Sequence, residues 1–295
     1  MSLHRPHSPD FVAAWRRLAV AAFGWRTRGP FVIVPSLFGR VTLSYLPLLT
    51  YTDATPATLG ELIARAEGAS YLIRLLADDA PPFSPGQPVT LRLALAGRDA
   101  GAIWTGLRPE CRNRVRKARR NGISLRRGRD PALIDDFHGQ LARTLHRHGA
   151  PLLPRDFFAR FPHEVEATYH VAYAAERPIA GLVAVRDGDL VWVPWVATDP
   201  EARPFCATDL LYWQSIGDAA DAGATIFDFG RSPFGGGTHR FKAKWGAEPV
   251  ALRWVAPRPI DVYRRFAAAR TIWRAVPRPL TDRMGPKLCR YLPDY

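Results

Sequence analysis

The sequence has few cysteines, no long hydrophobic run and no low-complexity tract. Its three cysteines lie far apart, so they cannot all pair, and they match no zinc-ligand spacing. The N-terminal apolar run, residues 18–25, is too short to span a bilayer and lacks a cleavage site. These absences predict a cytoplasmic protein with no bound metal and no disulfide framework.

Acidic residues are scarce relative to basic ones: 27 aspartates and glutamates stand against 41 lysines and arginines, a formal charge of +14. This excess favours polyanionic partners, namely phosphate-bearing substrates, tRNA or an anionic membrane face, and we expect no DNA partner. An arginine-rich composition can also produce the excess without any ligand. Apolar residues make up 47% of the 295 residues, which indicates a globular protein long enough for two lobes.

The apolar pattern switches between helical and strand-like periods, which predicts an α/β (α+β) fold. Helices are expected at 8–23, 55–68, 99–121 with a break at Pro109, 132–149, 155–161 and 207–223. Strands are expected at 31–49 (two strands, broken at Pro35 and Gly39), 69–77, 88–95, 123–127, 169–197 (three strands), 224–230 and 249–255. In the second half, three strands, a helix and a strand follow the order of an acyl-CoA N-acetyltransferase (GNAT) core, which many other α+β folds also contain.

The pattern divides the chain into two lobes and a tail. We expect an N-terminal lobe at 1–122, a C-terminal lobe at 123–256 and a basic helical tail at 257–295. Each lobe should hold a mixed, mostly antiparallel sheet flanked by helices. The tail carries an apolar face that either packs on the second lobe or lies on a membrane. The residues of this face are Tyr263, Phe266, Ile272 and Trp273.

A carboxylate stands inside the apolar strand 224–230. Asp228 lies in this strand and Arg231 at its end, and a buried acid is costly unless it is paired. These two residues either brace the strand end or fix the loop SPFGGGTH, which begins at Ser232 and carries Gly236 in a run of three glycines. Such a run permits close approach of a ligand or a hinge motion. The loop is no Walker site, because no Gly-Lys-Ser/Thr follows.

The next stretch, RFKAKWG, places cations beside aromatic side chains. Lys242 and Lys244 alternate with Phe241 and Trp245. A lysine held in this way can stabilise the negative charge of an acyl-transfer intermediate or clamp a phosphate. A solvated face with its aromatic residues in the core is the alternative.

Two other aromatic residues, Trp195 and Tyr212, are candidates for a cleft wall, although such residues more often belong to the core. An acyl-CoA enzyme usually opens the helix at 207–223 with a glycine-containing loop whose amides bind pyrophosphate. Here the residues read ARPFCATDLL. The missing glycine argues against ordinary acetyl-CoA binding.

Residues 110–129 hold eight arginines and one lysine against one glutamate. Arg112, Arg116, Arg119 and Arg120 are expected along one helical side. Because a helix with so many like charges repels itself unless anions are near, this side predicts contact with polyphosphate, tRNA or acidic lipid. We take Arg116 and Arg119 as substrate-binding candidates.

The sequence resembles the FemAB-like aminoacyl and acyl transferases, specifically the subgroup found with exosortase (PEP-CTERM) systems. The resemblance covers about residues 100–256 and rests on RNRVRKARRNGI, LIDDFHGQLARTLHRHGAPLLPRDFF, LVWVPWVAT, LLYW and FDFGRSPFGGGTHRFKAKWGAEPVALRW. It implies two GNAT-like lobes with a cleft between them, and places Phe241 and Lys242 in the cleft, the lysine assisting acyl transfer. It also implies aminoacyl-tRNA as donor and a peptidoglycan-precursor amine as acceptor. An asparagine expected near Thr208 or Asp209 is absent.

The main hypothesis is an acyl- or aminoacyltransferase that forms an amide on an amine of a cell-envelope or exopolysaccharide precursor. The acceptor would be phosphorylated or a glycan-lipid, the donor aminoacyl-tRNA, and no cofactor would be bound. Lys242 would stabilise the oxyanion, while Asp228, His239 or the substrate itself would take the amine proton. Arg231, Ser232, Gly236 and Lys244 would contact substrate.

Two alternatives remain open. The first is a GNAT-type N-acyltransferase that uses acyl-CoA, with the SPFGGGTH loop replacing the missing glycine loop. The second is a non-catalytic pair of lobes that binds anionic lipid or glycan in an export system, peripheral to the inner face of the membrane.

Overall fold

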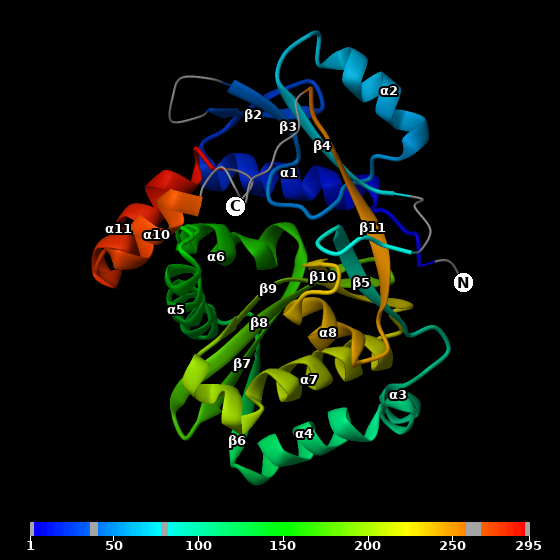
Figure 1. The fold of residues 1–295 in the computed structure, drawn as a ribbon, viewed down its shortest axis with the longest axis vertical. Coiled ribbons are helices and arrows are strands. Elements are labelled where there is room, and N and C mark those ends of the chain that lie inside the picture. The colour runs from blue at the N-terminus through cyan, green and yellow to red at the C-terminus, as the bar shows by residue number, and fades with distance from the viewer. Residues whose placement is uncertain (1–2, 36–40, 78–81, 258–266, 293–295) are drawn as a thin grey trace. The chain divides into compact units, whose positions relative to one another are not determined.

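The computed structural model describes residues 3–35, 41–77, 82–257 and 267–292 (Figure 1). The chain forms two compact units, and each is assembled from separate stretches of sequence. The first unit holds residues 1–5, 78–141 and 166–251, and the second holds residues 6–77, 142–165 and 252–295.

The first unit is built on a mixed, mostly antiparallel sheet in the order β11–β5–β10–β9–β8–β7–β6. All neighbours are antiparallel except β9 and β10, which are parallel because α7 (Ala207–Asp221) crosses between them. The strands are β5 (Pro88–Ala94), β6 (Ile123–Gly128), β7 (Glu166–Ala174), β8 (Arg177–Asp187), β9 (Leu190–Thr198), β10 (Ile226–Pro233) and β11 (Glu248–Val255), of which residues 248–251 belong to this unit.

Helices cover both faces of this sheet. Phe137 of α5 (Pro131–His148, of which residues 131–141 belong to this unit) lies 5.3 Å, between ring centroids, from Tyr169 of β7. Because successive strand residues face opposite sides, the neighbouring His170 faces α7, where its Nδ1 lies 3.9 Å from a carboxylate oxygen of Asp218. Pro109 occupies the first turn of a new helix, as expected. The remaining helices are α3 (Ala100–Gly106), α4 (Pro109–Arg120), η1 (Pro200–Phe205) and α8 (Gly237–Ala243).

The second unit repeats a crossover of this kind on a smaller sheet. Its strands run in the order β1–β2–β3–β4–β11, with β3 and β4 parallel. Thr55 begins the crossover helix α2 with a capping box, in which its side chain accepts from the amide of Thr58. The strands are β1 (Arg26–Arg28), β2 (Phe31–Pro35), β3 (Val41–Tyr45) and β4 (Tyr71–Leu76), and the helices are α1 (Pro9–Phe23), α2 (Pro56–Arg65), α6 (Arg155–Glu164), α10 (Ala267–Ala275) and α11 (Arg278–Cys289).

The core of the second unit is aromatic. Trp15 of α1 is fully buried, and its ring centroid lies 5.9 Å from that of Phe157 and 5.5 Å from that of Phe161, both on α6. Ser8 begins α1 and accepts a hydrogen bond from the amide of Phe11.

The expected α/β architecture is confirmed, with mixed, mostly antiparallel sheets flanked by helices. The compact units differ from the linear division at 122 and 256, because β5 pairs with β10 and because α6 packs on α1. The short elements β1, η1 and α8 were not expected: β1 and η1 have three and six residues, and α8 (GTHRFKA) contains a single large apolar side chain, too few for a helical period. Tyr263 and Phe266 of the expected apolar face lie outside the described residues.

Candidate active site around Lys242

Lys242 of α8 is held inside the protein by backbone oxygens. Its side chain is buried, and Nζ donates to the carbonyl oxygens of Gly230 and Arg231, both at 2.9 Å. Burial lowers the pKa of Lys242 to about 7; the Asp228 carboxylate opposes this shift and the Arg231 guanidinium adds to it. Near pH 7 the amine is therefore divided between its charged and neutral forms.

A bulge in β10 brings these two carbonyl groups together. The register with β5 shifts between Asp228 and Arg231, and Gly230 lies in the left-handed region with φ of +74°. A Cβ at this position would lie 2.8 Å from the carbonyl oxygen of Val193 on β9, so only glycine fits without strain. The paired register of β9 and β10 ends just before the bulge, at Asp228 and Trp192.

Asp228 anchors the bulge through a buried charge pair. Its carboxylate accepts from Arg92 Nε at 2.8 Å, from Thr90 Oγ1 at 2.5 Å and from the amide of Gly230 at 2.7 Å. The side chains of Asp228 and Arg92 are both fully buried, so each supplies the counter-charge that the other needs. Arg92 also donates to the carbonyl oxygen of Arg5 at 2.8 Å.

Arg92 and Thr90 are not among the site residues expected from the sequence. The signal was present in PVTLRLAL, where an arginine stands inside an apolar strand as Asp228 does in its own strand. Only the pairing of β5 with β10 shows that these two charges meet.

The glycine-rich loop has a local structural role. Gly235 adopts φ of +75°, and Gly236 begins α8 in close contact with Pro233. The turn is fastened by Phe234, whose amide donates to the carbonyl oxygen of Gln87 at 2.8 Å. These glycines thus carry the chain from β10 into the helix that presents Lys242. Substrate contacts of Ser232 and Gly236 stay predictions.

His239 lies one helical turn before Lys242 on α8. Its ring meets that of Phe234 with centroids 4.6 Å apart, and its buried Nδ1 has no hydrogen-bond partner in the described part of the chain. Desolvation lowers the pKa of His239, and the charges of Arg240 and Lys242 lower it further. The imidazole is therefore neutral at pH 7 and able to accept a proton.

An aromatic cluster lines the other side of α8. The Tyr212 ring lies 5.1 Å from Phe229, 5.6 Å from Phe241 and 6.4 Å from Trp245, between centroids. Burial raises the pKa of Tyr212. Lys244 Nζ lies 4.1 Å from the centre of the Phe241 ring, so the expected pairing of cations with aromatic faces is present.

Lys244 also meets a buried acid that the sequence analysis did not assign to the site. Asp209, in the first turn of α7, is 1% exposed and forms ion pairs with Lys244 and, at 3.0 Å, with Arg114 of α4. A carboxylate is stabilised at this position because helix N-termini carry partial positive charge. It lies where an expected asparagine was missing, and Cys206 before it takes the left-handed conformation, with φ of 59°.

Only some arginines of the basic run 110–129 are exposed to solvent. Arg116, Arg119 and Arg120 are exposed, with Arg116 above the Trp104 ring at 5.6 Å. Arg112 departs from the expected basic face, because it turns inward and donates to the carbonyl oxygens of Thr105 and Leu107, each at 2.8 Å. Trp195 on β9 is half-buried and lies 6.4 Å from Trp192 between ring centroids.

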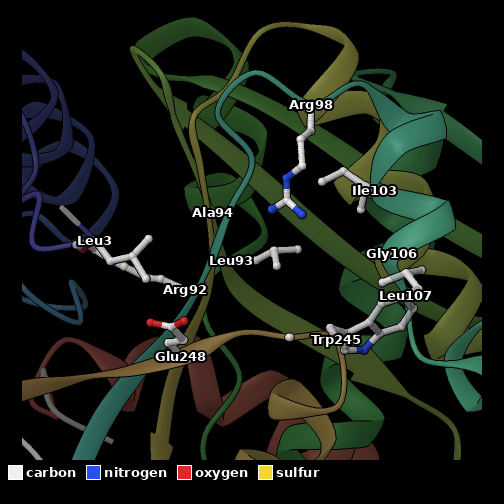
Figure 2. Close-up of a pocket in the computed structure, with 11 residues that line it drawn as sticks. Leu3, Arg92, Leu93, Ala94, Arg98, Ile103, Gly106, Leu107, Trp245 and Glu248 are labelled. Carbon is white, nitrogen blue, oxygen red and sulfur yellow. The ribbon is translucent and has the colours of Figure 1, made fainter. Parts of the chain in front are cut away.

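A cavity of about 200 Å³ lies beside Trp245 and the strand positions around Arg92 (Figure 2). Its apolar lining includes Leu93 and Trp245, and the charged side chains of Arg98 and Glu248 also border it. Lys242 is not among its lining residues. No cluster of His, Cys, Asp or Glu suited to a metal occurs in the ranges that the structure describes, and none of the helices within those ranges has the length and apolar character needed to cross a membrane.

Comparisons with known proteins agree with this architecture. Residues 106–243 match the family model described as an acetyltransferase (GNAT) domain. No curated protein sequence matches the chain at a significant level. Among solved structures, FemX superposes with a TM-score of 0.60 at 15% identity, covering 89% of this chain and 95% of FemX.

Two further solved structures are similar to this chain. L-PGS from Bacillus licheniformis gives a TM-score of 0.54 at 14% identity, covering 92% of this chain and 99% of L-PGS. The C-terminal domain of a protein assigned as a lysylphosphatidylglycerol synthetase, from Agrobacterium fabrum, gives 0.55 at 13% identity, covering 92% and 91%. Residues 106–243 are therefore similar to a GNAT-type acetyltransferase domain, and the mixed α/β fold of the chain is GNAT-like.

Proposed function

We propose that the protein is an acyl- or aminoacyltransferase that forms an amide on an amine of a cell-envelope or exopolysaccharide precursor, with aminoacyl-tRNA as donor. The GNAT domain match supports a transferase in general. The observation that carries the proposal is the buried Lys242, held by two carbonyl oxygens and with its pKa lowered to about 7. Such perturbed groups concentrate at catalytic sites.

The reaction would begin with attack of the acceptor amine on the ester carbonyl carbon of the donor. The carbonyl oxygen then carries a negative charge in the tetrahedral intermediate. The Lys242 ammonium has three N–H groups and gives two of them to the carbonyls of Gly230 and Arg231. The third would donate to the oxyanion, in a site from which burial has removed competing water.

The attacking amine must lose a proton, and the leaving oxygen must gain one. His239 is the base that the geometry favours, because its Nδ1 is unpartnered among the described residues and its lowered pKa keeps it neutral. Asp228 is better suited to positioning, since its two oxygens already accept from Arg92, Thr90 and Gly230. It would hold the bulge whose carbonyls bind Lys242.

The choice of donor rests on the first turn of α7. Asp209 places a negative charge there and occupies both Arg114 and Lys244. The pyrophosphate of an acyl-CoA bound at this helix end would meet that carboxylate, whereas an ester on tRNA needs no phosphate at this point. Exposed Arg116 and Arg119 on α4 would contact the tRNA backbone.

One of the similar solved structures supports the proposed chemical class of the acceptor. The name of the Agrobacterium fabrum protein gives a lysyl-phospholipid as its product, which supports a phosphorylated or glycan-lipid acceptor here. Membership of the exosortase-associated subgroup is part of the same proposal. Arg231, Phe241, Trp195 and Tyr212 would line the substrate path, since they lie on or beside β9, β10 and α8.

The second candidate keeps acyl-CoA as donor, and the acetyltransferase description of residues 106–243 favours it. In that case the Asp209 ion pairs would have to open when the cofactor binds. Asp209→Asn would then strengthen acyl-CoA binding, measured by calorimetry.

A two-donor assay tests the proposed function. The purified full chain is mixed with an extract of lipid-linked envelope precursors, and receives either bulk tRNA charged with radiolabelled amino acids or radiolabelled acetyl-CoA. We expect label from tRNA to enter a product that survives mild base, as an amide does and an ester does not. Label from acetyl-CoA alone would establish the second candidate. Label from neither donor, with saturable lipid binding, would leave a non-catalytic binding protein.

A further inference from the structure

Large apolar side chains that face solvent are few in the described ranges, and most of them gather on two helices. Ile272 on α10 is 67% exposed, and Leu280 and Met284 on α11 are 53% and 47% exposed. The others, Val41 and Phe205, lie far away in the sequence. Single exposed apolar residues are ordinary, whereas a cluster marks a contact surface.

The buried side of α11 is already in use. Thr281, Gly285 and Cys289 are buried at four-residue spacing, and Cys289 Sγ donates to the carbonyl oxygen of Leu152 at 2.9 Å. Gly285 lies so close to Leu152 that a Cβ would stand 2.5 Å from its amide nitrogen. Positions four apart share a face, so residues 280 and 284 form a second face, which is exposed.

α10 also packs on the protein with one side and exposes another. Arg270 Nε donates to the carbonyl oxygen of His148 at 3.1 Å, and Gly149 lies against the Arg270 backbone. Ile272 follows two positions later, about 200° round the helix, and so faces away from this contact. Both helices thus bind the protein by one side and expose apolar residues on the other.

Charge surrounds the exposed apolar residues. Residues 267–289 contain five basic side chains and one acid, Asp282, which is paired with Arg278 at 3.3 Å. We define the docking face as Ile272, Leu280 and Met284 with the exposed cations Arg283 and Lys287. A second copy of this surface would be repelled by like charge, and a nucleic acid would leave the apolar side chains without a partner.

We propose that the docking face binds an anionic phospholipid bilayer. Its apolar side chains enter the boundary between headgroups and acyl chains, and its cations meet the lipid phosphates. Basic amphipathic helices bind membranes in this way. Apolar insertion alone, or charge attraction alone, gives only weak binding. The proposal stands apart from the transfer reaction, because binding requires no substrate and none of these residues belongs to the candidate active site.

Co-sedimentation of the full chain with vesicles tests the docking face. Vesicles of phosphatidylcholine alone are compared with vesicles that also contain phosphatidylglycerol. We expect the fraction bound to rise about tenfold or more with the anionic lipid, and to fall with added salt. The variant Ile272→Ser/Leu280→Ser/Met284→Ser should lose about tenfold in binding, and Arg283→Gln/Lys287→Gln should lose the anionic preference.

The matched control is Val41→Ser/Phe205→Ser, which removes the exposed apolar side chains outside the docking face and should bind as the original protein does. All substituted residues are solvent-exposed, so thermal melting should confirm folding in every variant. Equal losses in the control and the triple serine variant would overturn the proposal. So would absence of binding to anionic vesicles, or a concentration-dependent dimer that the triple serine variant abolishes.

Discussion

The two units carry similar crossovers and bury very different side chains beside them. In one unit α2 connects the parallel strands β3 and β4, and in the other α7 connects β9 and β10. The described part of the second unit buries Arg74 as its single Arg, Lys, Asp or Glu. The first unit buries Arg92, Asp187, Asp209, Asp228 and Lys242.

The two buried arginines show what this difference means. Arg74 donates to the carbonyl oxygen of Leu46 at 3.0 Å, and its guanidinium carbon lies 5.8 Å from the centre of the Trp254 ring, so its partners include a backbone carbonyl and an aromatic face. Arg92 is paired with Asp228, which in turn fixes the amide of Gly230 beneath Lys242. Buried charge is expensive, and its concentration beside one crossover points to chemistry there.

The largest expected effect is on transfer. Lys242→Ala should lower kcat by about 10²–10³, the usual effect of removing one oxyanion donor. Arg74→Met, the matched change in the other unit, should leave kcat per folded molecule unchanged. The two-donor assay measures both rates, with folded fractions from circular dichroism. Equal losses in the two variants would remove the functional contrast between the units.

The next effect is on stability. Arg92→Met leaves the Asp228 carboxylate buried without its partner and should cost about 3–5 kcal/mol of unfolding free energy. Arg74→Met breaks a hydrogen bond to a carbonyl and should cost about 1–3 kcal/mol. Urea unfolding measures both. Adding Asp228→Asn to Arg92→Met should recover part of the loss; no recovery would mean that the pair does not act as a unit.

A smaller effect separates two glycines that share φ of +74°. Gly68, in the second unit, has nothing within 4 Å of an added Cβ, so Gly68→Ala should cost about 1–2 kcal/mol from backbone strain alone. Gly230→Ala adds the contact with the Val193 oxygen at 2.8 Å and should cost about 1–3 kcal/mol more. Thermal melting compares them, and equal shifts would contradict the close packing of the bulge.

Local features of the fold could be predicted from the sequence. Ser8 and Thr55 begin helices, Pro109 starts a new one, and the alternation at 169–197 gives three strands. These signals depend on neighbouring residues, which a sequence shows directly. The short helix α8 lacked such a signal, because GTHRFKA contains a single large apolar side chain and so shows no apolar period.

Long-range pairings of the candidate site could not be predicted. The strand pattern predicts Asp228 as a buried acid and leaves open whether Asp228 and Arg231 brace the strand end or fix the loop that follows. The observed ion pair joins Asp228 to Arg92, which stands 136 positions earlier and meets it through the β5–β10 register. Likewise Asp209, Arg114 and Lys244 come from α7, α4 and the end of α8. Nothing in the local pattern fixes such meetings.

The pH dependence of transfer tests the role of Lys242 most directly. With its pKa at about 7, the lysine loses its charge as the pH rises through 7, and an oxyanion donor is lost with it. Deprotonation of the acceptor amine changes the rate of every variant alike. We therefore divide the transfer rate of the original protein by that of Lys242→Arg at each pH, because the arginine side chain stays charged across this range. We predict that this ratio falls as pH rises through about 7. A ratio that rises with pH would show that Lys242 accepts a proton, and would contradict the assignment.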